Sequence, residues 1–140
     1  MATKSLIVDN KTFDISYEII NPSCEKDIVF LHGWGSNKEI MKNVFSSHLK
    51  NFRHIYIDFP GFGKSKNEYV LTTDDYVKIT DEFLKLLNSS KDVIAGHSYG
   101  GKIATRLNPK NLVLLSSAGI LEEKPVDVKL KIFFAKLLNK

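Results

Sequence analysis

The sequence contains one cysteine, Cys24, among its 140 residues, so no disulfide can form within the chain. A lone thiol is typical of a reducing compartment, and we expect a cytoplasmic protein. No run approaches the roughly 18 consecutive apolar residues that a membrane-spanning helix requires. The opening residues, MATKSLIVDN, hold too short an apolar run for a secretory signal.

The chain also lacks a strong charge of one sign. Its 20 basic residues face 16 acidic ones, and the basic residues are mostly lysines scattered along the whole length. A dispersed excess of this kind mainly keeps a surface solvated. Because no basic block with interleaved aromatic residues occurs, we expect no nucleic-acid partner.

The length and composition fit one globular domain, with 43% hydrophobic and 26% charged residues. Short apolar or alternating runs predict strands, and runs with helical spacing predict helices between them. The predicted strands cover residues 5–8, 13–20, 27–33, 54–63, 92–97 and 111–117, and the fourth ends in a glycine-rich turn. The predicted helices cover residues 37–50, 72–88 and 99–107.

This alternation predicts an α/β fold with a mostly parallel sheet of about six strands and flanking helices. The first two strands are the exception, because the polar residues between them predict a hairpin. Ligands of such folds meet the carboxyl ends of the parallel strands.

Residues 120–140 differ from the rest. Apolar side chains including Leu130 and Phe134 fall on one helical face, with lysines around it. This pattern is compatible with a basic amphipathic helix at a membrane surface or with a helix that packs over the site.

Three glycine-bearing turns follow three predicted strands, at residues 32–36, 58–65 and 96–101. The last one reads G-x-S-x-G, with Ser98 between Gly96 and Gly100. A sharp turn from strand to helix displays such a serine hydroxyl at the top of the sheet, and small flanking residues leave space for the crossing chain. Ser98 is therefore the candidate nucleophile.

An acyl-transfer site also needs N–H donors for the negative charge that forms on the carbonyl oxygen. The backbone N–H of Tyr99, at the start of the next helix, is one candidate. The N–H of Trp34 is the second, because Gly33 and the glycine after Trp34 let the backbone approach a substrate closely. The indole of Trp34 would then help to line an apolar pocket.

The turn Gly63-Lys64-Ser65 is similar to the end of a phosphate-binding loop, G-x-x-x-x-G-K-[ST]. Asp58 occupies the position of the first glycine of that pattern. Packing in a tight turn is therefore the favoured interpretation of this segment.

Taken together, the chain resembles the amino-terminal part of the α/β-hydrolase fold enzymes. The resemblance rests on the order and spacing of His32-Gly33, of Asp58 with its following glycines, of the Ser98 turn and of LVLLSSAG as the sixth strand. It implies a serine hydrolase of esters, thioesters or related acyl compounds, with no metal or organic cofactor. It also implies that residues 1–119 are core and that residues 120–140 open a cap.

The same resemblance implies a catalytic acid and then a histidine after the serine. All four histidines of this chain, at positions 32, 48, 54 and 97, precede Ser98. We therefore expect the 140 residues alone to be nearly inactive, as the amino-terminal part of an incomplete fold that lacks its last strands. The alternative is a non-catalytic protein that keeps the pocket for binding or partner contact.

In the incomplete fold, the strand at 111–117 becomes an exposed edge of the sheet. The expected partners are therefore a small acyl substrate and either a complementing carboxyl-terminal fragment or a second copy that pairs with this edge.

Overall fold

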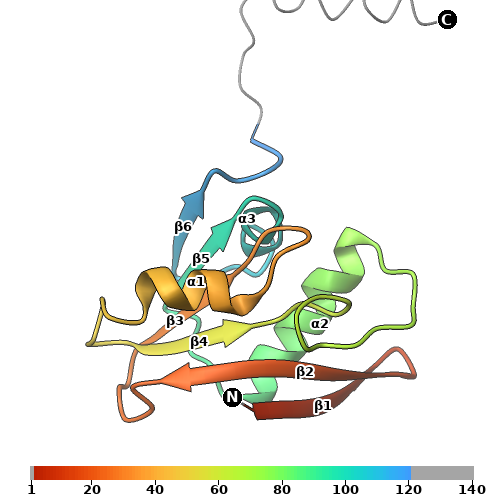
Figure 1. Cartoon of the computed structure of the whole chain (residues 1–140), viewed down its shortest axis with the longest axis horizontal. Helices are drawn as coiled ribbons and strands as arrows, with labels where there is room; N and C mark the ends of the chain where they lie inside the picture. Colours follow the sequence, from red (N-terminus) through yellow and green to blue (C-terminus); the bar gives the residue numbers. More distant parts are fainter. Residues whose placement is uncertain (1, 121–140) are drawn as a thin grey trace, which may run out of the picture.

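The computed structural model describes residues 2–120, so the segment predicted to be a cap or membrane-surface helix lies outside the described residues. Figure 1 shows one twisted sheet with helices on both faces. The strands are β1 (Ala2–Val8), β2 (Lys11–Ile20), β3 (Asp27–Leu31), β4 (Arg53–Ile57), β5 (Val93–His97) and β6 (Asn111–Leu115). The helices are α1 (Lys38–Phe45), α2 (Thr73–Leu86) and α3 (Tyr99–Ala104).

The six strands lie in the order β1-β2-β4-β3-β5-β6. β1 pairs antiparallel with β2, and β2 pairs antiparallel with β4, while β4, β3, β5 and β6 are parallel to one another. The predicted mostly parallel α/β sheet is confirmed. Because the four parallel strands run the same way, the turns after β3, β4, β5 and β6 all lie at the carboxyl ends of these strands.

The hairpin between β1 and β2 turns on Asp9 and Asn10, which have φ angles of 49° and 60°. Two left-handed residues in succession form the tight turn whose twist matches that of the flanking strands. β1 begins earlier than its apolar run predicted, because Ala2 already pairs with Tyr17 of β2. Backbone pairing therefore extends the strand through polar residues.

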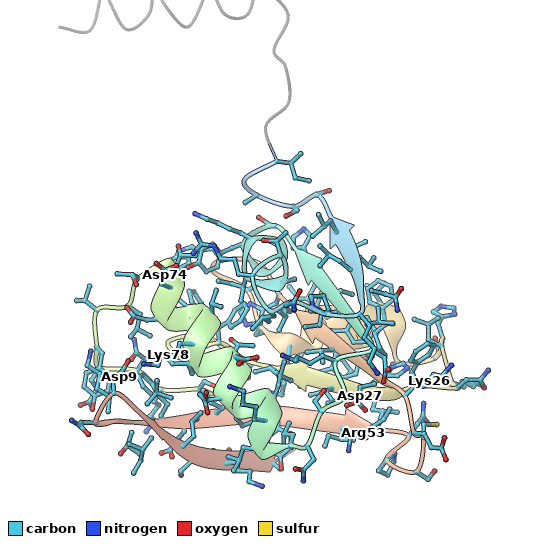
Figure 2. All side chains as sticks on the ribbon, turned by 180° about the vertical axis from the view of Figure 1, so that it is seen from behind. Asp9, Lys26, Asp27, Arg53, Asp74 and Lys78 are labelled. Carbon is cyan, nitrogen blue, oxygen red and sulfur yellow. The ribbon has the colours of Figure 1, made fainter. Side chains whose placement is uncertain are left out.

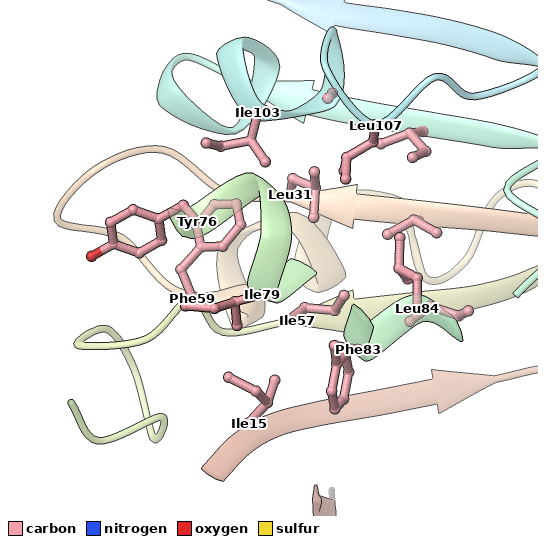
Figure 3. Packing of buried hydrophobic residues seen from close by; sticks show 14 of the residues in the cluster. Ile15, Leu31, Ile57, Phe59, Tyr76, Ile79, Phe83, Leu84, Ile103 and Leu107 are labelled. Carbon is pink, nitrogen blue, oxygen red and sulfur yellow. The ribbon is translucent and has the colours of Figure 1, made fainter. Parts of the chain in front are cut away.

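The larger part of the core lies between the sheet and the pair α2 and α3 (Figure 3). Phe83 and Ile79 of α2 are at most 2% exposed and belong to one buried cluster with Ile15 and Ile57 of the sheet. On the other face, Phe30 of β3 stacks between neighbouring aromatic rings under α1. Burial of these side chains fixes the strands whose ends carry the site.

Helix α1 is shorter than its periodicity predicted, since it ends at Phe45 rather than near residue 50. Met41 is buried and Phe45 is partly buried, but Ile40 and Val44 are 55% and 56% exposed. Within residues 2–120, α1 is the one helix on its face of the sheet, so only a narrow stripe of it finds contacts (Figure 1).

Helix α2 begins where the sequence predicted. Thr72 is its N-cap, and Thr72 and Asp75 form a reciprocal capping box. Each side chain accepts a hydrogen bond from the backbone N–H of the other residue, which satisfies two donors at the start of the helix.

At the end of the sheet remote from the glycine turns, the guanidinium of Arg53 in β4 donates two hydrogen bonds, of 2.6 and 2.7 Å, to the carboxylate of Asp27 in β3 (Figure 2). Burial raises the pKa of the Asp27 carboxyl, but the hydrogen bonds from Arg53 and Ser90 outweigh this effect and hold the pKa below 3.8. The pair therefore ties the starts of two parallel strands together in their charged forms.

The part of the chain that the structure describes contains no helix with the length and apolarity needed to cross a membrane.

Candidate active site at the carboxyl ends of the parallel strands

The turns that follow β3 and β5 meet as the sequence predicted. A Cβ atom placed on Gly33 would lie 3.3 Å from the Cβ of Ser98 and 3.0 Å from Nδ1 of His97. The loop after β3 therefore runs directly alongside Ser98. Two residues that are 65 positions apart in the sequence become neighbours because β3 and β5 are adjacent parallel strands.

Ser98 occupies the junction between the end of β5 and the start of α3. Its φ and ψ angles are 50° and −115°, a backbone conformation that residues other than glycine rarely adopt. The last residue of β6 and the segment after it hold this backbone in place. The N–H of Ser98 donates to the carbonyl of Leu115 over 3.0 Å, and the carbonyl of Ser98 accepts from Ala118 over 2.9 Å.

The two glycines of G-x-S-x-G are required because neighbouring backbone atoms leave no room for a side chain at either position. A Cβ on Gly96 would come within 2.5 Å of the carbonyl oxygen of Gly100. A Cβ on Gly100 would overlap the backbone carbonyls of Leu31 and His32 at the end of β3. The turn can therefore fold against β3 only because both positions lack a side chain.

Gly101 is a third position in this turn where a side chain does not fit, and the sequence pattern did not single it out. A Cβ at this position would overlap the side chain of Ser117, which follows β6. The double glycine after Tyr99 is the signal that could have indicated this close approach.

Trp34 and Tyr99, the two predicted N–H donors, each lie one position from the contact between Gly33 and Ser98. Tyr99 is the first residue of α3, and Trp34 follows Gly33 in the loop beside Ser98. Among residues 2–120, the backbone N–H groups of Trp34 and Tyr99 have no hydrogen-bond acceptor. Two unpaired N–H groups next to a serine can receive an anionic oxygen.

An aromatic cluster borders the same region. The ring of Trp34 meets the rings of Phe62, Tyr99 and Tyr76 edge to face, with centroid distances of 4.9, 5.2 and 6.1 Å. Trp34 is nevertheless 63% exposed. It therefore offers an apolar surface beside Ser98 while its edge is fixed by its neighbours.

None of the four histidines, all of which lie within the described residues, hydrogen-bonds to the Ser98 hydroxyl. His32 is buried, donates to the carbonyl of Gly33 and accepts from the N–H of Phe59. His54 binds Tyr56 and the carbonyl of Leu49 near the start of β4. His97 is exposed beside Gly33, and His48 is exposed after α1.

The electrostatics of His32 support a structural role. Burial lowers its pKa below 6.5, which outweighs the opposing effects of the Gly33 carbonyl and Asp58. The imidazole is therefore neutral at pH 7, with a proton on Nδ1 and a lone pair on Nε2, as its two hydrogen bonds require.

The turn that resembles a phosphate-binding loop is filled by a side chain of the protein itself. A Cβ on Gly63 would overlap the carboxyl group of Asp58, and the N–H of Lys64 donates to that carboxyl over 3.0 Å. The carboxyl group of Asp58 thus packs inside this turn, as the packing interpretation predicted.

Sequence reasoning missed Lys38. The lysines were expected on the surface, yet Lys38 is 1% exposed and pairs with Asp58.

No group of three or more histidine, cysteine, aspartate or glutamate side chains within residues 2–120 is arranged to hold a metal ion.

The model of the alpha/beta hydrolase family matches residues 28–137. The chain therefore belongs to the alpha/beta hydrolase family.

Relatives and solved structures agree with this assignment. A pimeloyl-[acyl-carrier protein] methyl ester esterase of Wigglesworthia glossinidia brevipalpis is 33% identical over 104 residues, which cover 70% of this chain and 39% of the relative. An esterase of the same name from Proteus mirabilis is 31% identical over 61% of this chain and 33% of its own length. A probable hydrolytic enzyme from Pseudomonas aeruginosa has the same fold, with a TM-score of 0.72 and 22% identity over 86% of this chain and 42% of that protein. The chain thus spans less than half the length of these proteins.

Proposed function

We propose that this chain is the nucleophile-bearing part of a serine hydrolase that cleaves carboxylic esters or related acyl bonds. The observation that carries the proposal is the placement of Ser98. Ser98 lies in a strained turn beside the loop that carries Trp34, and among residues 2–120 the N–H groups of Trp34 and Tyr99 have no acceptor.

In the proposed reaction, the Ser98 oxygen attacks the carbonyl carbon of the ester and gives its proton to a general base. The N–H groups of Trp34 and Tyr99 bind the oxyanion of the tetrahedral intermediate. The intermediate collapses and releases the alcohol, which takes up the proton from the base, and the acyl group remains on Ser98. Water, deprotonated by the same base, then releases the acid and restores the serine.

The substrate class follows from the relatives and from the aromatic surface. Two curated relatives are named as esterases of a methyl ester carried on acyl-carrier protein. The exposed ring of Trp34 suits an apolar acyl chain next to Ser98. We therefore propose a small ester with an apolar acyl chain as substrate.

We also propose a cytoplasmic location, because the chain has a single cysteine.

The general base is the part of the mechanism that the described residues do not provide. His32 and His54 are engaged in other hydrogen bonds, and the sequence holds no histidine after Ser98. We propose that the base comes from polypeptide other than these 140 residues. Residues 120–140, as the proposed start of a cap, would cover the pocket.

The sheet edge at β6 is the proposed contact for a further segment. Within the described residues β6 pairs only with β5, and Leu112 and Val113 are each 41% exposed. An unprotected apolar edge favours pairing with another strand, from a complementing carboxyl-terminal fragment or from a second copy. We expect sedimentation equilibrium to detect self-association that a Val113→Lys substitution reduces. A monomer at every concentration would argue against the second copy.

The same absence of a base favours a second candidate, a binding protein that keeps the pocket without catalysis. An activated ester separates the two. We expect p-nitrophenyl butyrate to leave one butyryl group on Ser98, located by peptide mass mapping, and Ser98→Ala to prevent it. Equal acylation of the parent chain and the alanine variant would favour the binding protein.

A further inference from the structure

A buried ion pair lies close to the proposed site. Lys38, the first residue of α1, and Asp58, directly after β4, are each 1% exposed, and their charged atoms are 2.7 Å apart. A buried ion pair contributes little net stability, because removing two charges from water offsets most of their attraction. Its presence therefore calls for an explanation other than stability.

The pair fixes backbone as well as side chains. One oxygen of Asp58 accepts from the backbone N–H of Lys38 over 2.7 Å, and the other accepts from its ammonium group. The ammonium also donates to the hydroxyl of Ser16 in β2 over 2.9 Å. The start of α1 is thereby held against the middle of β2 and the end of β4.

Phe59, the residue after Asp58, holds the opposite end of the loop between β3 and α1. Nε2 of His32 accepts a hydrogen bond of 3.1 Å from the N–H of Phe59, and its Nδ1–H donates to the carbonyl of Gly33 over 2.8 Å. Asp58 and Phe59, two consecutive residues, thus anchor both ends of loop 33–37. That loop carries Trp34.

We propose that Lys38 and Asp58 are positioning residues, whose buried ion pair fixes loop 33–37 so that the N–H of Trp34 points to the oxyanion at Ser98. The catalytic consequence rests on the proposed function, whereas the effect on the loop does not. A displacement of the donor by about 1 Å is sufficient to slow such a reaction by up to about 100-fold.

The test uses a double variant, Lys38→Met with Asp58→Asn, in the 140-residue chain. Lys38→Met alone leaves a buried unpaired carboxylate and is expected to destabilise the fold, whereas removing both charges is often tolerated. The amide oxygen of the Asp58→Asn side chain still accepts from the N–H of residue 38. Urea unfolding establishes that the double variant is folded.

Two readouts follow the loop. Trp34 is the single tryptophan of the chain, so its fluorescence reports directly on loop 33–37. We expect its emission to shift to the red and its quenching by acrylamide to increase, because the ring loses its contacts with Phe62 and Tyr99. We expect fluorophosphonate modification of Ser98 to slow by about tenfold or more.

The matched control is Lys42→Met, which removes an ion pair of the same helix with Glu18, 2.9 Å away, without touching Asp58. It should keep the parent fluorescence and the parent rate. A folded double variant with parent Trp34 emission would overturn the proposal. If the parent chain is not modified at Ser98, the nucleophile proposal fails, and the Trp34 emission alone decides whether the ion pair positions the loop.

Discussion

The variant Gly100→Ala is expected to lose about 3 kcal/mol or more of its free energy of unfolding. The added methyl group would overlap the backbone carbonyls of Leu31, the last residue of the central strand β3, and of His32 directly after it. Backbone atoms inside a sheet cannot retreat without breaking strand pairing, so the turn must move away from β3. The midpoint of urea unfolding, measured by circular dichroism, checks this result.

Gly35→Ala is the control for this variant. Gly35 lies at φ 71°, but a Cβ there would meet no atom within 4 Å. Only the cost of a left-handed alanine remains, about 1 kcal/mol. Equal losses for the two variants would show that the contact with β3 is not what makes Gly100 necessary.

The variant Ser98→Gly is expected to lose all labelling by a fluorophosphonate while its free energy of unfolding rises by about 1 kcal/mol. The labelling disappears because the attacking oxygen is gone. Stability rises because glycine adopts a φ of 50° and a ψ of −115° without the strain that serine bears. Mass spectrometry and urea unfolding measure the two effects on the same samples.

Ser98→Ala separates the two causes. It removes the oxygen but keeps a Cβ in the strained conformation, so we expect it to lose the labelling without gaining stability. If Ser98→Gly is no more stable than Ser98→Ala, the backbone at the turn stores no strain.

The sequence predicted which turns lie side by side, because this depends on the backbone and on strand order. Gly96, Ser98 and Gly100 have few alternative roles at the end of a buried strand, and the loop with Gly33 lies where parallel pairing must bring it. The order of the strands along the chain was therefore sufficient to bring together residues from distant segments.

The sequence failed where the signal depends on which surfaces are covered. Ile40 and Val44 share the helical spacing of Met41 and Phe45, yet α1 meets the sheet along a narrow stripe and leaves both exposed. The burial of Lys38 could not be foreseen either, because it depends on a carboxylate that is 20 positions away and on the shape of the turn after β4. Periodicity describes one helix and carries no information on such partners.

The rate at which a fluorophosphonate modifies Ser98 tests the central claim most directly. We predict one phosphonyl group for each chain, located on Ser98 by peptide mapping and absent from Ser98→Ala. Modification should be slow in the 140 residues alone and faster when polypeptide that supplies a histidine base is joined to them. A folded chain whose serines all react at the same rate, or in which Ser98 stays unmodified, would contradict the claim.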